Sequence, residues 1–253
     1  MTIPRRGSQH WPQIAINRHP NLVQTALQRS GAIERHLAVT WHSPLKGDGF
    51  KEYRDQPALT LAGLRYLSGR ALKDFWPARG PVWDAIGTAS DGTPIFVEAK
   101  AHIPEAASSG SRATPESMLL IQRSLAEARR AYAPRASADW HGVFYQYANR
   151  LAHHYFLRKL NGVQAALVFL YFTNATEMQG PASELEWKGA VRLIHSVLGI
   201  PADLKAFGVF EAFVNVSALR DRCPRLTATF AWPRPFAGKS PVPSVARQVR
   251  RKQ

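Results

Sequence analysis

The chain has 253 residues, 45% of them apolar, which is enough to bury the core of one large domain or two small ones. Its formal charge of +15 favours a polyanionic partner, most often nucleic acid. The single Cys223 excludes an internal disulfide, no secretory signal follows Met1, and the longest apolar run is too short to span a membrane, so we expect a cytoplasmic protein with no membrane partner.

The positive charge is concentrated at the two ends of the chain. Residues 1–33 contain four arginines and no acid, residues 222–253 contain eight basic residues and no acid, and the stretch between them is nearly balanced. We therefore predict a poorly packed basic arm over 1–33 with a short helix near Leu22–Gln28, one α/β domain over 34–221, and a basic, proline-rich tail over 222–253. The ends could attract nucleic acid or could simply be solvated tails.

A β-hairpin predicted between Pro81 and His102 carries charge where a buried strand should not. Two apolar runs flank the turn signal Asp91-Gly92. Because side chains alternate along a strand, Glu98 and Lys100 share one face, and Asp84 on the neighbouring strand can supply a second carboxylate. Such charges are seldom buried unless they are paired or bound to a metal.

An Asp followed, after a short hairpin, by Glu-x-Lys resembles the PD-(D/E)xK phosphodiesterase superfamily, the restriction-endonuclease-like fold. The resemblance implies an α/β fold with a mixed central sheet flanked by helices, and a Mg²⁺- or Mn²⁺-dependent nuclease. We predict that it cuts DNA, while the sequence itself does not distinguish DNA from RNA. It implies that Asp84, Glu98 and the main-chain carbonyl of Ala99 hold the cation and that Lys100 assists the attacking water. One departure is that the proline of the motif lies at Pro81, not directly before Asp84.

The spacing of this motif is not specific by itself. Glu186–Lys188 and Asp203–Lys205 share it, the first in a helical pattern and the second just after a helix end. Only Glu98–Lys100 lies on a predicted strand with another acid on the partner strand. The alternative interpretation is a salt bridge on a half-exposed hairpin.

The resemblance also implies that the first helix of the domain contributes another acid to the metal site. We predict a helix over Ala58–Leu64, led into by the segment from Phe50, and the candidates are Glu52 and its rival Glu34. The alternative for either residue is a solvent-facing glutamate.

A helix predicted over about 142–160 carries an unusual polar stripe. One side is largely apolar, whereas Gln146, Asn149, Arg150 and His153 cluster on the other, without the Glu or Lys that usually fill a solvent face. The resemblance implies that Gln146 and Arg150, with Asn149 and His153 as lesser candidates, contact the scissile phosphate. An exposed amphipathic face is the alternative. Adjacent His153 and His154 point in different directions, which argues against a zinc site.

The remaining pattern fits an α/β domain. In chain order we predict a strand at His36–Trp41, core aromatics Phe75 and Trp76, a mobile loop at Pro104–Arg112, a helix capped by Thr114, a doubly buried strand at Gln164–Thr173, a helix begun by the capping box Ser183–Glu186 and a last strand at Phe207–Val216.

Three functions remain open on the sequence. The first is a metal-dependent nuclease, the second a catalytically inactive nucleic-acid-binding protein of the same fold, and the third an unrelated α/β enzyme in which the side chains of Asp84 and Glu98 diverge. The pattern does not specify the oligomeric state.

Overall fold

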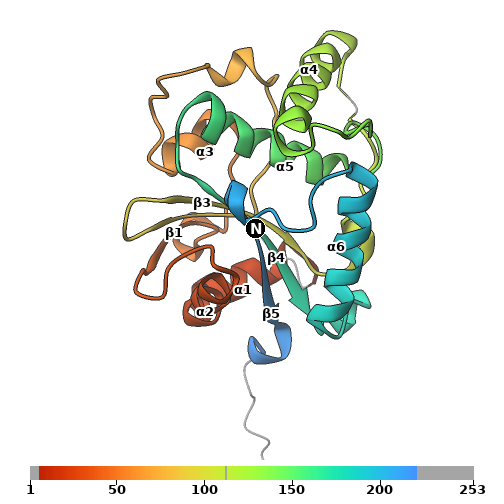
Figure 1. The fold of residues 1–253 in the computed structure, drawn as a ribbon. Helices are drawn as coiled ribbons and strands as arrows, with labels where there is room; N and C mark the ends of the chain where they lie inside the picture. Colours follow the sequence, from red (N-terminus) through yellow and green to blue (C-terminus); the bar gives the residue numbers. More distant parts are fainter. Residues whose placement is uncertain (1–5, 112, 221–253) are drawn as a thin grey trace, which may run out of the picture. The chain divides into compact units, whose positions relative to one another are not determined.

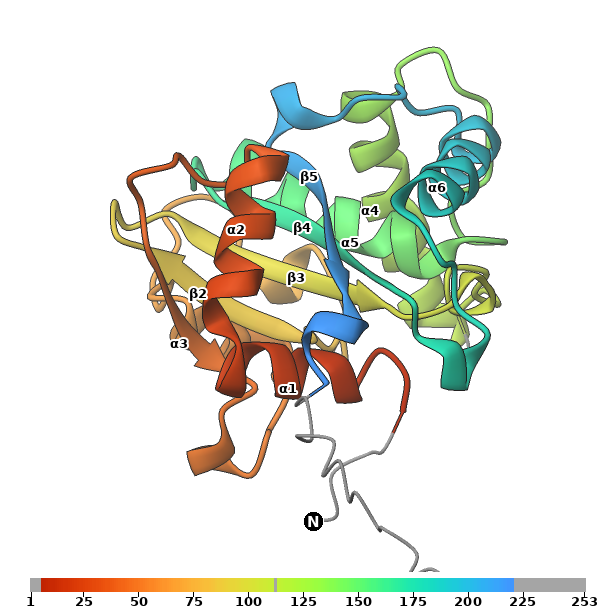
Figure 2. The same cartoon turned by 90° about the horizontal axis from the view of Figure 1, so that it is seen from below.

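A five-stranded mixed sheet forms the centre of the computed structural model. The structure describes residues 6–111 and 113–220, which belong to a folded unit that ends at Arg220. The strands run in the order β1-β2-β3-β4-β5; Figure 1 labels β1, and Figure 2 labels β2 to β5. Their bounds are Val39–Ser43, Ala85–Ala89, Pro94–Lys100, Ala166–Thr173 and Val209–Asn215. β1, β2 and β3 pair antiparallel, whereas β4 is parallel to both β3 and β5. The predicted α/β class with a mixed sheet is confirmed.

Helices cover both faces of this sheet. α1 (His10–Arg18) and α2 (Pro20–Ser30) lie on one face, and α3 (Asp55–Leu61), α4 (Pro115–Tyr132), α5 (Tyr145–Tyr155) and α6 (Glu184–Leu198) lie on the other (Figures 1 and 2). Short helical turns occupy Lys46–Asp48, Leu72–Asp74, Ile103–Glu105, Thr176–Met178, Lys205–Phe207 and Val216–Ala218. No helix within the two described ranges is long and apolar enough to cross a bilayer.

The predicted hairpin is the β2–β3 pair, with Asp91-Gly92 at its turn. Ala85 lies opposite Val97 and Ile86 opposite Phe96. The alternation along β3 is as expected, because Ile95, Val97 and Ala99 join the core under α1 and α2 while Phe96 joins the core under α5. Continuing the register by one residue sets Asp84 opposite Glu98, on the α5 face.

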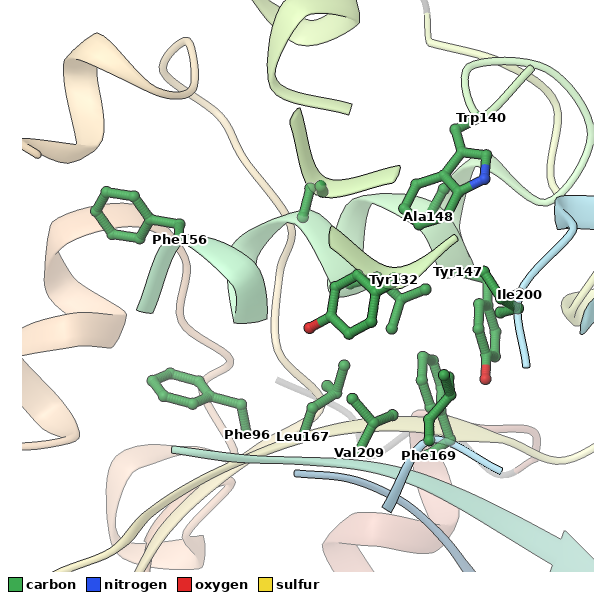
Figure 3. Packing of buried hydrophobic residues seen from close by; sticks show 14 of the residues in the cluster. Phe96, Tyr132, Trp140, Tyr147, Ala148, Phe156, Leu167, Phe169, Ile200 and Val209 are labelled. Atoms are coloured by element: carbon green, nitrogen blue, oxygen red, sulfur yellow. The ribbon is translucent and has the colours of Figure 1, made fainter. Parts of the chain in front are cut away.

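The strand predicted to be buried on both faces is β4, whose eight residues are all buried. Leu167 and Phe169 point towards α5, where Phe169 stacks on Tyr147 at 4.0 Å between ring centroids (Figure 3). Val168 and Leu170 point into the opposite core. A near-continuous apolar run is what a strand between two helical layers requires.

Most of the other predicted elements are present. Thr114 caps α4 by accepting from the Ser117 N–H, and Ser183 caps α6 by accepting from the Glu186 N–H. Phe75 and Trp76 are buried. The first predicted strand is shifted to Val39–Ser43, and α3 begins at Asp55, earlier than expected.

The prediction of a poorly packed N-terminal arm over 1–33 is wrong for the residues that the structure describes. α1 and α2 bury Trp11, Ile16, Val23 and Leu27 against the sheet, so the folded unit includes them. These two amphipathic helices bury their few apolar residues against a sheet face that the other described helices do not cover. The tail predicted over 222–253 and Cys223 lie outside the described residues.

The helix predicted over 142–160 is shorter and has two parts. α5 begins at Tyr145 because Phe144 adopts a left-handed backbone conformation with φ of 66°. A π-helical turn, Phe156–Leu160, continues it to the predicted end.

Candidate active site

A cavity of about 1020 Å³ opens at the end of β3 on the α5 face. Asp84, Glu98 and Lys100 lie on its wall. The rest of the lining comes from the segment Trp76–Val82, most of the segment Pro104–Ser111, Ser8, and residues at or near the starts of α4 and α5. Of the predicted phosphate contacts, Gln146, Asn149 and Arg150 reach this cavity. Residues from widely separated parts of the sequence therefore meet here.

The two predicted metal-binding acids lie side by side. Asp84 precedes β2 directly, and its Oδ2 accepts a 2.7 Å hydrogen bond from the Ala99 N–H on β3. Glu98 belongs to the same face of the hairpin and is 3% exposed. The third alternative from the sequence, in which the side chains of Asp84 and Glu98 diverge, does not agree with this strand register.

Both carboxylate oxygens of Glu98 bind cationic side chains. Lys100 Nζ donates to Oε1, while Arg150 donates to Oε2 from Nε at 2.6 Å and lies within 2.5 Å of it through Nη2. Arg150 also donates to the Val82 carbonyl at 2.8 Å and to Asn149 Oδ1 at 2.7 Å. This pairing satisfies a buried charge that would otherwise cost several kcal/mol.

The two acids have opposite pKa shifts. Burial raises the pKa of Asp84 well above its ordinary value, and the neighbouring charge of Glu98 raises it further. Burial acts on Glu98 in the same direction, but the charges and hydrogen bonds of Arg150 and Lys100 outweigh it and lower the pKa of Glu98. Glu98 is thus the acid that holds its negative charge more strongly.

Gln146 connects this charge network to the cavity wall. Its Oε1 accepts from Lys100 Nζ at 3.2 Å, and its backbone N–H donates to Ser108 Oγ at 2.8 Å. The polar stripe of α5 is not an exposed face, because Asn149 and Arg150 are buried beside Glu98. The alternative prediction, that this stripe is an exposed amphipathic face, is therefore wrong for Asn149 and Arg150.

The prediction that His153 contacts phosphate is not supported by its position. The ring is buried against Trp76, at 4.7 Å between centroids, and near Trp83, and it does not belong to the cavity lining. Its Nδ1 donates to the Asn149 carbonyl at 2.9 Å. Burial lowers the pKa of His153 to about 3, so the ring is neutral and serves packing.

Neither candidate for the third acid lines the cavity. Glu34 is exposed before β1 and lies 3.4 Å from His36, so its candidacy is wrong. Glu52 precedes α3 and is not in its first turn. Burial raises the pKa of Glu52, and although a hydrogen bond from Gln9 opposes this, the negative charge of Glu98 adds to the rise. Glu52 therefore lies within electrostatic range of the site without lining it.

The donor set suits a hard cation that keeps some of its waters. Among residues 6–111 and 113–220, no cluster of three or more His, Cys, Asp or Glu side chains could hold a metal ion. Mg²⁺ is commonly held by only one or two carboxylates together with substrate phosphates. Asp84 and Glu98, with the Ala99 carbonyl, match that requirement, provided that Glu98 exchanges one of its cationic partners.

Two residues that shape the site were not predicted. Glu105 accepts from the Ala101 N–H at 2.8 Å and fixes the start of the cavity wall to the end of β3. Ser108 receives the Gln146 N–H. The sequence pointed to them only by placing both in the loop predicted at Pro104–Arg112. Arg112 itself lies outside the described residues. Comparisons with models of protein families, with curated proteins and with solved structures find no match to this chain.

Proposed function

We propose that the protein is a metal-dependent nuclease of the restriction-endonuclease-like fold that hydrolyses phosphodiester bonds, with DNA favoured. The observation that carries this proposal is the meeting of Asp84, Glu98 and Lys100 on the wall of one cavity. Gln146 and Arg150 from α5 contact the same three-residue group.

The strand order supports the fold assignment. Three antiparallel strands are followed by two helices and then by a parallel strand, and the acidic hairpin is β2–β3. The antiparallel strands β1 to β3 and the parallel β4 make the kind of mixed, helix-flanked sheet that the motif implies.

Each side chain has a defined role in this proposal. Asp84, Glu98 and the Ala99 carbonyl bind the Mg²⁺ or Mn²⁺, which when bound lowers the pKa of a water and neutralises charge on the phosphate. Lys100 orients the attacking water through its ammonium, which also pairs with Glu98. Gln146 and Asn149 orient the phosphate. When the ion pair between Arg150 and Glu98 opens, Arg150 stabilises the charge that develops on the phosphate.

The test is cleavage of plasmid DNA by the full chain in Mg²⁺ or Mn²⁺. We expect Asp84→Ala combined with Glu98→Ala to lower cleavage at least about a hundredfold. Lys100→Ala should also lower it, whereas Lys205→Ala, in the Asp203–Lys205 pair of the same spacing, should cut like the unchanged protein. Cleavage that survives the double substitution refutes the site.

One observation favours a second candidate, a nucleic-acid-binding protein that does not cut. Both oxygens of Glu98 are already neutralised by Lys100 and Arg150, a pairing that competes with a metal ion. This candidate predicts salt-sensitive DNA binding in EDTA and no cleavage when Mg²⁺ or Mn²⁺ is added.

A further inference from the structure

Arg79, which lines the cavity, and Asp55, which is hydrogen-bonded to it, both adopt a backbone conformation that favours glycine. Asp55 has φ of 51° and Arg79 has φ of 68°. Such conformations are strained for residues other than glycine and persist only where the surrounding structure enforces them. Here the enforcing contact joins the two residues to each other.

Asp55 fixes the turn of the segment Trp76–Val82. Its Oδ2 accepts from the Arg79 N–H at 3.0 Å, and its Oδ1 accepts from the Gly80 N–H at 2.9 Å. A Cβ at Gly80 would lie 2.8 Å from Asp55 Oδ1 and 3.2 Å from His153 Nε2, so only glycine fits between the carboxylate and α5. The turn at Arg79 and Gly80 therefore lies between the Asp55 carboxylate on one side and His153 of α5 on the other.

The same segment is attached to the charge network of the site. The Val82 carbonyl accepts from Arg150, which pairs with Glu98. The position of the turn relative to the proposed catalytic residues is thus fixed by hydrogen bonds at both of its ends.

The charges on the cavity wall single out Arg79. The described residues that line the cavity include the cations Arg79, Lys100 and Arg150. Lys100 and Arg150 are both ion-paired with Glu98. Arg79 is exposed, and no carboxylate among the described residues forms an ion pair with its guanidinium. Its charge is available to an anion that enters the cavity.

We propose that Arg79 binds a backbone phosphate of the nucleic acid next to the one that is cut, and that Asp55 is the residue that positions it. This inference rests on the proposed function. The guanidinium presents a planar pair of donors that matches phosphate oxygens, and the strained turn holds it at the cavity rim before the substrate arrives.

The test distinguishes the effect of losing the guanidinium from the effect of relieving the backbone strain at Arg79. Arg79→Gly removes the side chain but suits the left-handed turn, so we expect a melting temperature that is unchanged or higher. In EDTA, binding of a fluorescein-labelled DNA duplex should weaken roughly tenfold, and the slope of log K against log salt should fall by about 0.9. Arg79→Lys should retain most of that slope.

A matched control is Gln179→Gly. Gln179 is also exposed, has φ of 53° and does not line the cavity. It should gain the same backbone relief with DNA affinity unchanged. Asp55→Ala should weaken binding although Arg79 is present, and unchanged affinity in that variant overturns the positioning role.

The outcomes distinguish failure of the role proposed for Arg79 from failure of the proposed nuclease function. If the unchanged protein cuts or binds DNA but Arg79→Gly binds with the same affinity and salt slope, the role of Arg79 is refuted and the proposed function stands. An equal loss in Gln179→Gly also refutes it. If the unchanged protein neither binds nor cuts DNA, both fall together.

Discussion

The two faces of β3 have entirely different chemistry. Ile95, Val97 and Ala99 face α1 and α2 in an apolar core. Phe96, Glu98 and Lys100 face α5, and there the buried carboxylate needs a guanidinium from another element. An apolar face tolerates many partners of the right volume, whereas a buried charge requires particular atoms at particular positions. Both faces of the strand therefore contribute to stability, but only the α5 face includes buried charge.

The largest expected effect comes from breaking the charged face. Arg150→Ala leaves Glu98 buried with Lys100 alone and should lower the free energy of unfolding by about 3 to 5 kcal/mol. Urea denaturation at neutral pH measures it. Arg192→Ala, on the exposed side of α6, is the control and should change stability by less than about 0.5 kcal/mol. A loss below about 1 kcal/mol for Arg150→Ala would show that Glu98 does not depend on this partner.

The second effect is acid destabilisation through α5. Burial lowers the pKa of both His153 and His154 to about 3 from an ordinary 6.5. As pH falls through that window the unfolded chain binds protons first, so stability is lost between pH 6.5 and about 3. We expect urea midpoints to fall over this range and to fall less in His153→Gln. Equal pH dependence in the two proteins would contradict the buried, neutral state of this ring.

The smallest effects have opposite signs on the two faces. Because the pKa of Asp84 is raised, its contribution to stability is lost as pH rises past the ordinary 3.8. Asp84→Asn keeps an acceptor for the Ala99 N–H and should raise stability at neutral pH by on the order of 1 kcal/mol. Ile95→Val on the apolar face should lower it by about 1 kcal/mol. Two changes of the same sign, measured by thermal unfolding, would contradict this division.

The local parts of the fold were predictable because their signals are short. The turn at Asp91-Gly92, the alternation along β3 and the caps Thr114 and Ser183 each depend on a few neighbouring residues. They were enough to set Asp84 and Glu98 on one face. The coarse α/β class followed from the same signals.

What could not be predicted depends on contacts between distant segments. The pairing of Arg150 with Glu98 joins residues 52 positions apart. The packing of α1 and α2 depends on the sheet face opposite α5, and the role proposed for Arg79 depends on a backbone turn to which Asp55 is hydrogen-bonded. His153 matched the polar stripe, but the aromatic rings around it are invisible to a helical periodicity.

The parallel pairing of β3 with β4 also governs how the molecule reaches its native state. In the sequence, α4 and α5 lie between these two strands, so the chain must close a long loop before β3 and β4 can align. Closing so long a loop is entropically slow, so folding is expected to be limited by this crossover. No early, local intermediate would then possess the completed charge cluster, and a nascent chain would form the candidate site only in the final cooperative step.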